Sequence, residues 1–263
     1  MKIITFAAIK GGVGKTTLTY NYGEWLAEKY KVLLIDADPQ ASLSQTYNVY
    51  RPNRSLTDVF NNSHLSAPDL ILHEPNLDLI PSSVSLDDVE SSLETRTNKE
   101  FVLYMWFYDN YQILKQYDYV LIDCHPDFSV ITQNAIVLSD MVLSPIEPSQ
   151  YSFNAKSMLL TRFDTLKNTL VDPKKRKSYV TAKLYFIGNR IRKGVASSQS
   201  FVSIMRKDPN TIAYISEREL LNQSTLFSKP IGQMATDHST YEKNKSFFND
   251  LFNTFETLTK LAK

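Results

Sequence analysis

The chain of 263 residues contains a single cysteine, Cys124, and only seven glycines. One cysteine cannot form an internal disulfide, and it excludes cluster sites built from cysteine pairs. A reducing cytoplasm fits this composition. No apolar run approaches the length of a membrane span, and the N-terminal apolar run lacks the cleavage site of a signal peptide. We therefore expect a soluble, cytoplasmic protein.

The sequence also lacks a strong charge of one sign and any segment of low complexity. Its formal net charge is +1, so the total charge by itself predicts no acidic partner. No linker rich in Gly, Pro or Ser divides the chain, and no internal repeat is present. A chain of this length can bury one large core, so we expect a single domain over residues 1–263.

Apolar runs typical of buried strands alternate with helical patterns along the chain. Strands are expected at 2–8, 31–36, 77–83, 117–123, 141–148 and 180–189. Helices are expected from residue 16 onward and at 84–94, 98–116 and 153–170. This alternation predicts an α/β fold with a doubly wound, mostly parallel sheet and helices on both faces.

A glycine-rich loop, AIKGGVGKTTLTYN (8–21), follows the first expected strand. The pattern G-x-x-x-x-G-K-[ST] would place its first glycine at position 9, where Ile9 stands. The remaining glycines still allow the backbone to approach a phosphate, Lys15 supplies a charge for the β and γ phosphates, and the Thr16 hydroxyl is suited to Mg²⁺. The expected cofactor-binding residues of this loop are Lys10, Gly11, Gly12, Val13, Gly14, Lys15, Thr16 and Thr17.

The segment KGGVGKTT resembles the deviant Walker A motif of the ParA/MinD group of P-loop ATPases. In that family the extra lysine, here Lys10, crosses a dimer interface and touches the phosphates of the partner's nucleotide. A cation supplied in this way neutralises charge on the transferring phosphoryl group and makes dimerisation depend on ATP. The resemblance implies an ATPase with ATP and Mg²⁺ as cofactors.

Two further motifs extend the resemblance. IDADPQAS (35–42) matches the family segment in which the first carboxylate, Asp36, supports the magnesium shell and the second, Asp38, orients the attacking water. VLIDCHPDFS (120–129) matches the Walker B strand, in which Asp123 holds a magnesium-bound water. The resemblance thus assigns catalysis to Lys10, Lys15 and Asp38, and the metal to Thr16, Asp36 and Asp123.

Cys124 and His125 stand where the family more often has D-T-P-P. A thiol nucleophile needs a base and a zinc site needs three or four ligands, but the other histidines show no ligand spacing. We favour a buried small residue for Cys124 and a loop hydrogen bond for His125 over a catalytic role. Asn189 ends FIGNRIRKG (186–194) at the place where the family has an asparagine that reads adenine, although an asparagine there is also an ordinary turn residue.

Positive charge is concentrated in one window, residues 172–207, which carries +9 while the rest of the chain carries −8. Such segregation suits non-specific binding to a nucleic-acid backbone, although a charged run is often only a solvated face. The expected DNA-binding residues are Lys174, Lys175, Arg176, Lys177, Arg190, Arg192, Lys193, Arg206 and Lys207. Lys183 also belongs to this window.

Within the group, the chain resembles the short ParA proteins that lack an N-terminal helix-turn-helix. This resemblance covers nearly the whole chain, including segments 55–60, 134–152 and 229–241. It implies a DNA partition ATPase that forms an ATP-dependent homodimer, associates with the nucleoid and works with a ParB-like centromere-binding partner. Two alternatives remain: a MinD-like ATPase at the membrane surface, and a nucleotide-gated scaffold that coats DNA with little turnover.

The C-terminal segment tests the membrane alternative at the level of sequence. It carries an apolar stripe formed by Phe247, Phe248, Leu251, Phe252, Phe255, Leu258 and Leu261. From Ser246 onward its charges sum to zero, so it lacks the cationic face that anionic lipid requires. We therefore expect this stripe to pack in the core, and we expect no membrane partner.

Overall fold

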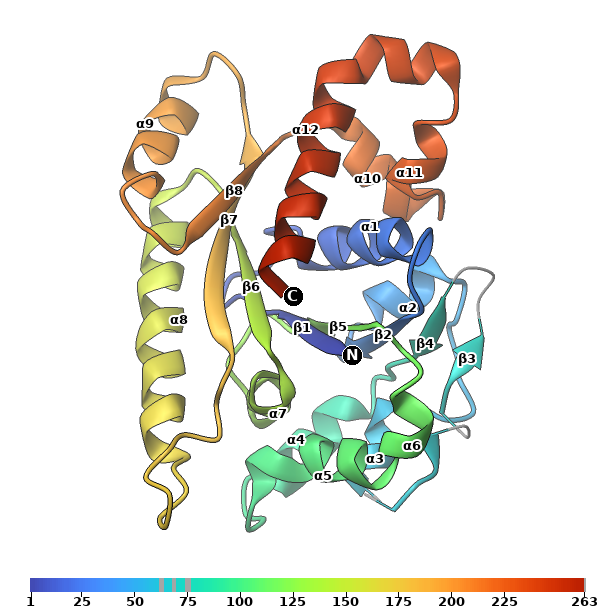
Figure 1. Cartoon of the computed structure of the whole chain (residues 1–263), viewed down its shortest axis with the longest axis vertical. Coiled ribbons are helices and arrows are strands. Elements are labelled where there is room, and N and C mark those ends of the chain that lie inside the picture. Colours follow the sequence, from blue (N-terminus) through green and yellow to red (C-terminus); the bar gives the residue numbers. More distant parts are fainter. Residues whose placement is uncertain (62–63, 68–69, 74–76, 263) are drawn as a thin grey trace.

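A computed structural model describes residues 1–61, 64–67, 70–73 and 77–262. Its centre is one eight-stranded sheet with the strand order β3-β4-β2-β5-β1-β6-β7-β8, which runs through the middle of the molecule in Figure 1. The strands are β1 (Lys2–Phe6), β2 (Val32–Ala37), β3 (Leu72–His73), β4 (Asp78–Ile80), β5 (Tyr119–Cys124), β6 (Met141–Ile146), β7 (Lys183–Ile191) and β8 (Thr211–Ser216). All neighbouring strands pair in parallel except β3 and β4.

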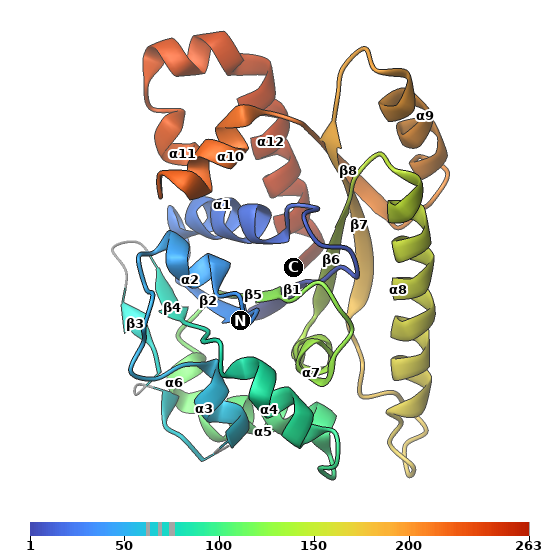
Figure 2. The ribbon, with the colours of Figure 1, turned by 180° about the vertical axis from the view of Figure 1, so that it is seen from behind.

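Helices cover both faces of this sheet, as Figures 1 and 2 show. The shorter ones are α2 (Ser42–Thr46), α3 (Leu56–Asn61), α4 (Leu86–Leu93), η2 (Lys99–Phe101), α5 (Val102–Asp109), α6 (Tyr111–Leu114), α7 (Val130–Leu138), α10 (Glu219–Leu226) and α11 (Ile231–Met234). The longer ones are α1 (Lys15–Ala27), α8 (Gln150–Thr169), α9 (Ala196–Met205) and α12 (His238–Ala262). The expected doubly wound α/β fold is thereby confirmed.

Successive side chains of the central strands alternate between two layers of the core, one on each face of the sheet. In β5, Val120 and Ile122 belong to the layer that includes residues of α3–α9, whereas Leu121 belongs to the layer beneath α1 and α10–α12. Successive side chains of a strand point to opposite faces, so a central strand covered on both sides must be apolar throughout. Every residue of β5 is buried.

The six expected strands are all present, although their bounds differ by a few residues. The stretch expected to be helical at 98–116 is helical in the structure, but it is divided into η2, α5 and α6. Asn110 lies at the break, and its side chain donates to the carbonyls of Leu65 and Trp106 at 3.2 and 3.0 Å and accepts from the Ala67 amide at 2.8 Å. Such side-chain bonds offer the backbone an alternative to the helical ladder.

The C-terminal stripe packs in the core as expected. In α12, Phe248, Leu251, Phe255 and Leu258 are at most 1% exposed, although Leu261 at the end of the helix is 42% exposed. These side chains contact the layer that also includes α1. Within the described residues, no helix combines the length and the apolar character needed to cross a membrane. The single domain over residues 1–263 stays a prediction.

Candidate functional site

The glycine-rich loop joins the end of β1 to the start of α1. Gly12 and Gly14 adopt the left-handed region, with φ of 74° and 96°, where residues with a Cβ are strained. A Cβ at Gly14 would also lie 2.5 Å from Nδ2 of Asn189. Gly14 caps α1 without a side-chain hydrogen bond, so the first N–H groups of the helix remain available to an anion. The loop thus has the local geometry of a phosphate cradle without a glycine at position 9.

Asn189 is brought to this loop from the carboxyl end of β7. Its Nδ2 donates to the Val13 carbonyl at 2.8 Å, and its Oδ1 is buried without a hydrogen-bond partner among the described residues. Asn189 also lines a cavity of about 160 Å³ beside Gly14 and Thr17. Its amide therefore has one free acceptor next to the expected nucleotide loop, as a group that reads a base would need.

Two carboxylates of the site stand side by side on neighbouring strands. Asp36 in β2 is in register with Asp123 in β5, and both side chains are fully buried. Burial, reinforced by nearby carboxylates, raises the pKa of Asp36 to about 6 and that of Asp123 to about 7. The positive charge of Lys15 opposes this rise at Asp123 but does not cancel it.

Asp36 is held by a residue that the sequence reasoning missed. Its carboxylate accepts from the Ser44 amide at 2.8 Å and from the Ser44 hydroxyl at 2.7 Å, and from the Asp38 amide at 3.2 Å. The Ser44 hydroxyl also accepts from the Ser82 amide at 3.0 Å. Ser44 lies in α2, directly after the D-x-D-P-Q segment, so its proximity in sequence was the available signal.

The donors around Asp123 fit a magnesium ion held jointly with a nucleotide. One Asp123 oxygen, Oδ2, is buried and has no partner among the described residues. The other, Oδ1, accepts from the Thr19 hydroxyl at 3.4 Å, and the Thr16 side chain is close enough to help lower the pKa of this carboxyl group. The described residues contain no group of three or more Asp, Glu, His or Cys side chains placed to hold a metal alone. Mg²⁺ typically binds one or two carboxylates together with phosphate oxygens, which agrees with this sparse donor set.

Asp38 lies just beyond the end of β2, beside the carboxylate pair. It is 7% exposed, and its Oδ1 accepts from the Gln40 amide at 2.9 Å. This bond fixes the carboxylate close to the same edge of the sheet, where open α/β sheets place their ligands. The structure therefore brings Lys15, Thr16, Asp36, Asp38 and Asp123 together, and their catalytic and metal roles stay predictions.

Lys10 is paired within its own chain. Its ammonium contacts the carboxylate of Glu147, which follows β6, and donates to the Ser149 hydroxyl at 3.3 Å. Glu147 also lies 3.6 Å from the Arg190 guanidinium. The Lys10 and Glu147 side chains are 29% and 21% exposed. Lys10 must therefore leave a cation-binding carboxylate before it can serve a second subunit.

Cys124 is buried and His125 forms a local hydrogen bond, as the sequence analysis favoured. The Cys124 thiol is fully buried, and this burial raises its pKa well above the usual value, so a thiolate is suppressed. His125 Nδ1 pairs with Asp127 Oδ2 at 2.9 Å. Although burial acts to raise the pKa of Asp127, its hydrogen bonds with Ser129, His125 and Thr132 lower it overall.

The basic window does not form one continuous surface. The loop at 174–177 lies before the start of β7, whereas Arg190 is the penultimate residue of that strand and α9 follows beyond its far end (Figures 1 and 2). A strand of nine residues spans about 30 Å. The expected DNA-binding residues therefore fall into two groups, one before β7 and one from its end to just beyond α9, and their role stays a prediction.

The basic residues at the end of β7 and directly after α9 are exposed. Two of them, Arg190 and Arg192, are paired with carboxylates. Arg192 forms two contacts with the carboxylate of Glu217, one of them at 3.1 Å, and Arg190 faces Glu147. Lys193 and Arg206 line a surface cavity of about 380 Å³ at the start of α9. This end of β7 thus presents cations next to the nucleotide loop.

A family model described as an AAA domain matches residues 1–175. An uncharacterized protein of Mycobacterium tuberculosis is 35% identical over 174 residues, or 64% of this chain and 54% of that protein. The chromosome partitioning protein ParA of Caulobacter vibrioides is 29% identical over 238 residues, covering 88% of this chain and 86% of that protein. The chain therefore belongs to the family that this AAA-domain model describes, as a P-loop ATPase of the ParA type.

A solved structure agrees over almost the full length of the chain. A putative plasmid partition protein from Borrelia burgdorferi, bound to AMPPNP, superposes with a TM-score of 0.79 at 26% identity and covers 98% of both chains. The resemblance to ParA proteins expected from the motifs is thus confirmed. The chain spans about half the length of the mycobacterial relative.

Proposed function

We propose that this ParA-type chain is a DNA partition ATPase that hydrolyses ATP to ADP and phosphate. The observation that carries this proposal is the convergence of a phosphate-binding loop with Lys15, Asp36, Asp38 and Asp123 at one edge of the sheet. ATP would lie in the loop, with Lys15 neutralising its phosphates and Asn189 facing its base. Asp38 would orient the attacking water.

Magnesium would be held by the Thr16 hydroxyl and supported by Asp123 and Asp36. Such an ion, when bound, supplies positive charge to the phosphate oxygens during transfer. The chain's own contribution is to bury the carboxylates, to fix Asp36 through Ser44 and to exclude bulk water. No arginine lies among these residues, so turnover of the isolated protein is expected to be slow.

The active form we propose is a homodimer that sandwiches two ATP molecules. Lys10 of each subunit would leave Glu147 and reach the nucleotide of its partner. Phosphate competes with a carboxylate for an ammonium group, so nucleotide binding and pairing of the subunits become linked. A chain with Lys10→Ala should bind ATP as a monomer but fail to dimerise, and an unaffected dimer would contradict the role in trans.

The DNA-binding face we propose is the end of β7 and α9, with Lys193, Arg206 and Lys207 as its free cations. It lies on the same side of the molecule as the nucleotide loop, so ATP-dependent pairing can join two such faces. The loop at Lys174–Lys177 is about 30 Å away and is the weaker candidate. Binding would be non-specific, because the contacts are to phosphates.

A ParB-like partner that stimulates hydrolysis and a nucleoid location follow from the similarity to chromosome and plasmid partition proteins. The membrane-surface alternative is less favoured, since the apolar stripe of α12 is already used in the core. The scaffold alternative differs from the partition ATPase in having little ATP turnover. Phosphate release that stays flat with DNA and partner, and is unchanged by Asp38→Ala, would favour it.

The decisive experiment titrates DNA with ATP, ADP or no nucleotide at two salt concentrations. We expect tight binding with ATP only, and weaker binding at high salt. The double substitution Lys193→Glu and Arg206→Glu should weaken DNA binding. It should also reduce the slope of log K against log salt concentration by about two. The matched control, Lys174→Glu and Lys175→Glu, changes the charge equally and should act much less. An equal loss of DNA affinity in the control would show that the loop at the other end of β7 also binds DNA.

A further inference from the structure

A groove of about 610 Å³ lies at the edge of the sheet where the parallel strands begin. Two of its lining residues show this position, because Asp140 directly precedes β6 and Thr181 lies two residues before β7. The glycine-rich loop follows the other end of β1, which pairs in parallel with β6. A strand of six residues separates the two edges by about 20 Å. The groove, called here the α5 groove, is therefore separate from the expected nucleotide site.

One wall of the α5 groove is the helix α5, which is apolar around nearly its whole circumference. Its outward face exposes Tyr104, Met105 and Tyr108, which are 49%, 40% and 76% exposed, and the first two of these line the groove. A helix that is apolar all round is normally covered on all sides. Its inward face packs in the core and consists of Val102, Leu103, Trp106 and Phe107. The outward face is thus the kind of apolar surface that marks an interaction site.

The opposite wall is the loop between α8 and β7, which carries Tyr179 and four basic residues. Phe101, directly before α5, packs edge to face against Tyr179 with ring centroids 5.2 Å apart, so the two walls are in contact. Both lie at the lower end of the molecule in Figure 1. The side chains of residues 174–177 are all exposed, and none of them forms an ion pair with a carboxylate of the described residues.

The two carboxylates that line the groove are already engaged with backbone donors. Asp172 Oδ1 accepts from the amides of Lys174 and Lys175 at 2.8 and 2.9 Å, and Asp140 Oδ2 accepts from the Ile3 amide at 2.9 Å. The ammonium groups of Lys175 and Lys177, which also line the groove, have no such partner among the described residues. The groove therefore combines exposed apolar surface with positive charge that its own chain leaves available.

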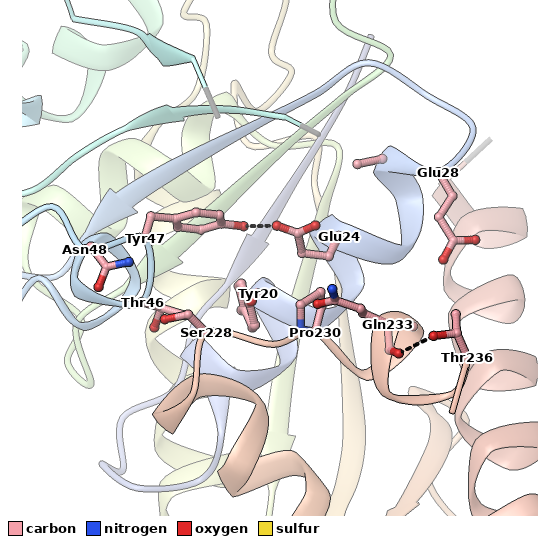
Figure 3. Close-up of a pocket in the computed structure, with 12 residues that line it drawn as sticks. Tyr20, Glu24, Glu28, Thr46, Tyr47, Asn48, Ser228, Pro230, Gln233 and Thr236 are labelled. Carbon is pink, nitrogen blue, oxygen red and sulfur yellow. Dashed lines mark hydrogen bonds between the residues drawn. The ribbon is translucent and has the colours of Figure 1, made fainter. Parts of the chain in front are cut away.

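A cavity of about 470 Å³ between α1, α2 and α11 differs in this respect (Figure 3). Its charged lining residues are Glu24 and Glu28, and Glu24 already accepts from the Tyr47 hydroxyl at 2.8 Å. Of these two cavities, only the α5 groove offers lysines beside an exposed apolar face.

We propose that the α5 groove binds a short acidic segment of another polypeptide. An apolar side chain of that segment lies against Tyr104 and Met105, and its carboxylates pair with Lys175 and Lys177. Charge complementarity of this kind selects the partner and its register. The inference goes beyond the proposed function and does not depend on it.

The shape and charge of the groove favour a peptide over other anionic partners. A bilayer surface is flat and does not fill a groove, whereas a single side chain does. A continuous row of phosphates, in a nucleic acid or on anionic lipid, would bring negative charge against Asp140 and Asp172 as well as the lysines, and like charges placed together oppose binding. A segment with few carboxylates meets the lysines alone.

The test selects short random peptides, displayed as a library, for binding to the nucleotide-free chain. The most enriched peptide is then synthesised with a fluorescent label and titrated. We expect enriched peptides to carry Asp or Glu next to Leu, Phe or Trp, and we expect their binding to weaken as salt is added. Lys175→Glu with Lys177→Glu should weaken binding about tenfold. The matched control is Lys29→Glu with Lys31→Glu, which reverses two exposed lysines elsewhere and should leave the affinity unchanged.

A second pair of variants tests the apolar wall. Tyr104→Ser with Met105→Ser removes exposed side chains of α5 and should also weaken binding of the peptide about tenfold. The control Tyr151→Ser with Met158→Ser removes the same two residue types from α8, where they are 77% and 46% exposed, and should have no effect. Circular dichroism verifies that each variant is folded.

Several results would overturn the proposal. Selection that enriches no peptide, enriched peptides without acidic residues, or losses of affinity that are equal in the controls would each contradict it. Displacement of the bound peptide by oligo-dT or by vesicles containing phosphatidylserine would assign the groove to a nucleic acid or a membrane instead. A dimer of the nucleotide-free chain that is lost with Tyr104→Ser and Met105→Ser would assign it to a second copy. Lys15→Ala should not change the peptide affinity, so failure here and failure of the proposed ATPase are distinguishable.

Discussion

The pairing of Lys10 with Glu147 leads to a quantitative prediction. If Lys10 must leave Glu147 to reach a partner's nucleotide, the ion pair opposes dimerisation. Both side chains are less than one third exposed, at 29% and 21%, and partly exposed pairs contribute about 0.2–1 kcal/mol each. A symmetric dimer breaks two of them, which costs about 0.4–2 kcal/mol in total. Glu147→Gln should therefore tighten the dimer by about 2- to 30-fold.

The assay is sedimentation velocity with AMPPNP and Mg²⁺ over a range of protein concentrations, because a non-hydrolysable analogue separates pairing from turnover. Glu217→Gln serves as the matched control, since it removes one carboxylate from Arg192 without touching Lys10. Glu147 also faces Arg190, so Arg190→Gln tests that second contact and should leave the dimer unchanged. A dimer that weakens with Glu147→Gln, or that tightens equally with the control, would refute the reasoning.

Further predictions concern the buried groups of the site. Burial raises the pKa of Asp123 from an ordinary 3.8 to about 7, so the free energy of unfolding falls as pH rises from about 4 to about 7 and levels off above that. Asp123→Asn should therefore add up to about 4 kcal/mol at pH 8 and nothing near pH 4, measured by urea unfolding. Cys124 should resist a thiol reagent at pH 8 until denaturant is added. Lys15→Ala should abolish nucleotide binding or hydrolysis, measured by titration and phosphate release.

The sequence predicted the groups that lie close together along the chain. The loop glycines, Lys15 and the carboxylates at the ends of β2 and β5 follow from short motifs, because parallel strands place their carboxyl ends at one edge. Contacts between distant segments were not predictable in this way. Glu147 lies 137 positions from Lys10, and the bond between Asn189 and Val13 joins positions 176 apart.

One strand was not predicted, and one helical stretch that was predicted is interrupted in the structure. β8 is an edge strand in which only Ala213 and Ile215 are buried, so it lacks the continuous apolar run that identified the central strands. The helical stretch at 98–116 is interrupted at Asn110. Nothing in the local sequence pattern marks this asparagine as a break. Its effect depends on Leu65 and Ala67, which the fold brings to it. In both cases tertiary contacts outweighed the local pattern.

The expected nucleotide site contains groups that have no partner among the described residues. Asp123 Oδ2 and Asn189 Oδ1 are buried without partners among the described residues, at the ends of two different strands that flank the same loop. A buried polar atom left in this state costs about 1–3 kcal/mol, so a ligand that satisfies both recovers that free energy on binding. Packing alone would favour apolar residues at both positions. Their retention beside the loop is therefore best explained by a ligand with a cation at one end and a hydrogen-bonding base at the other.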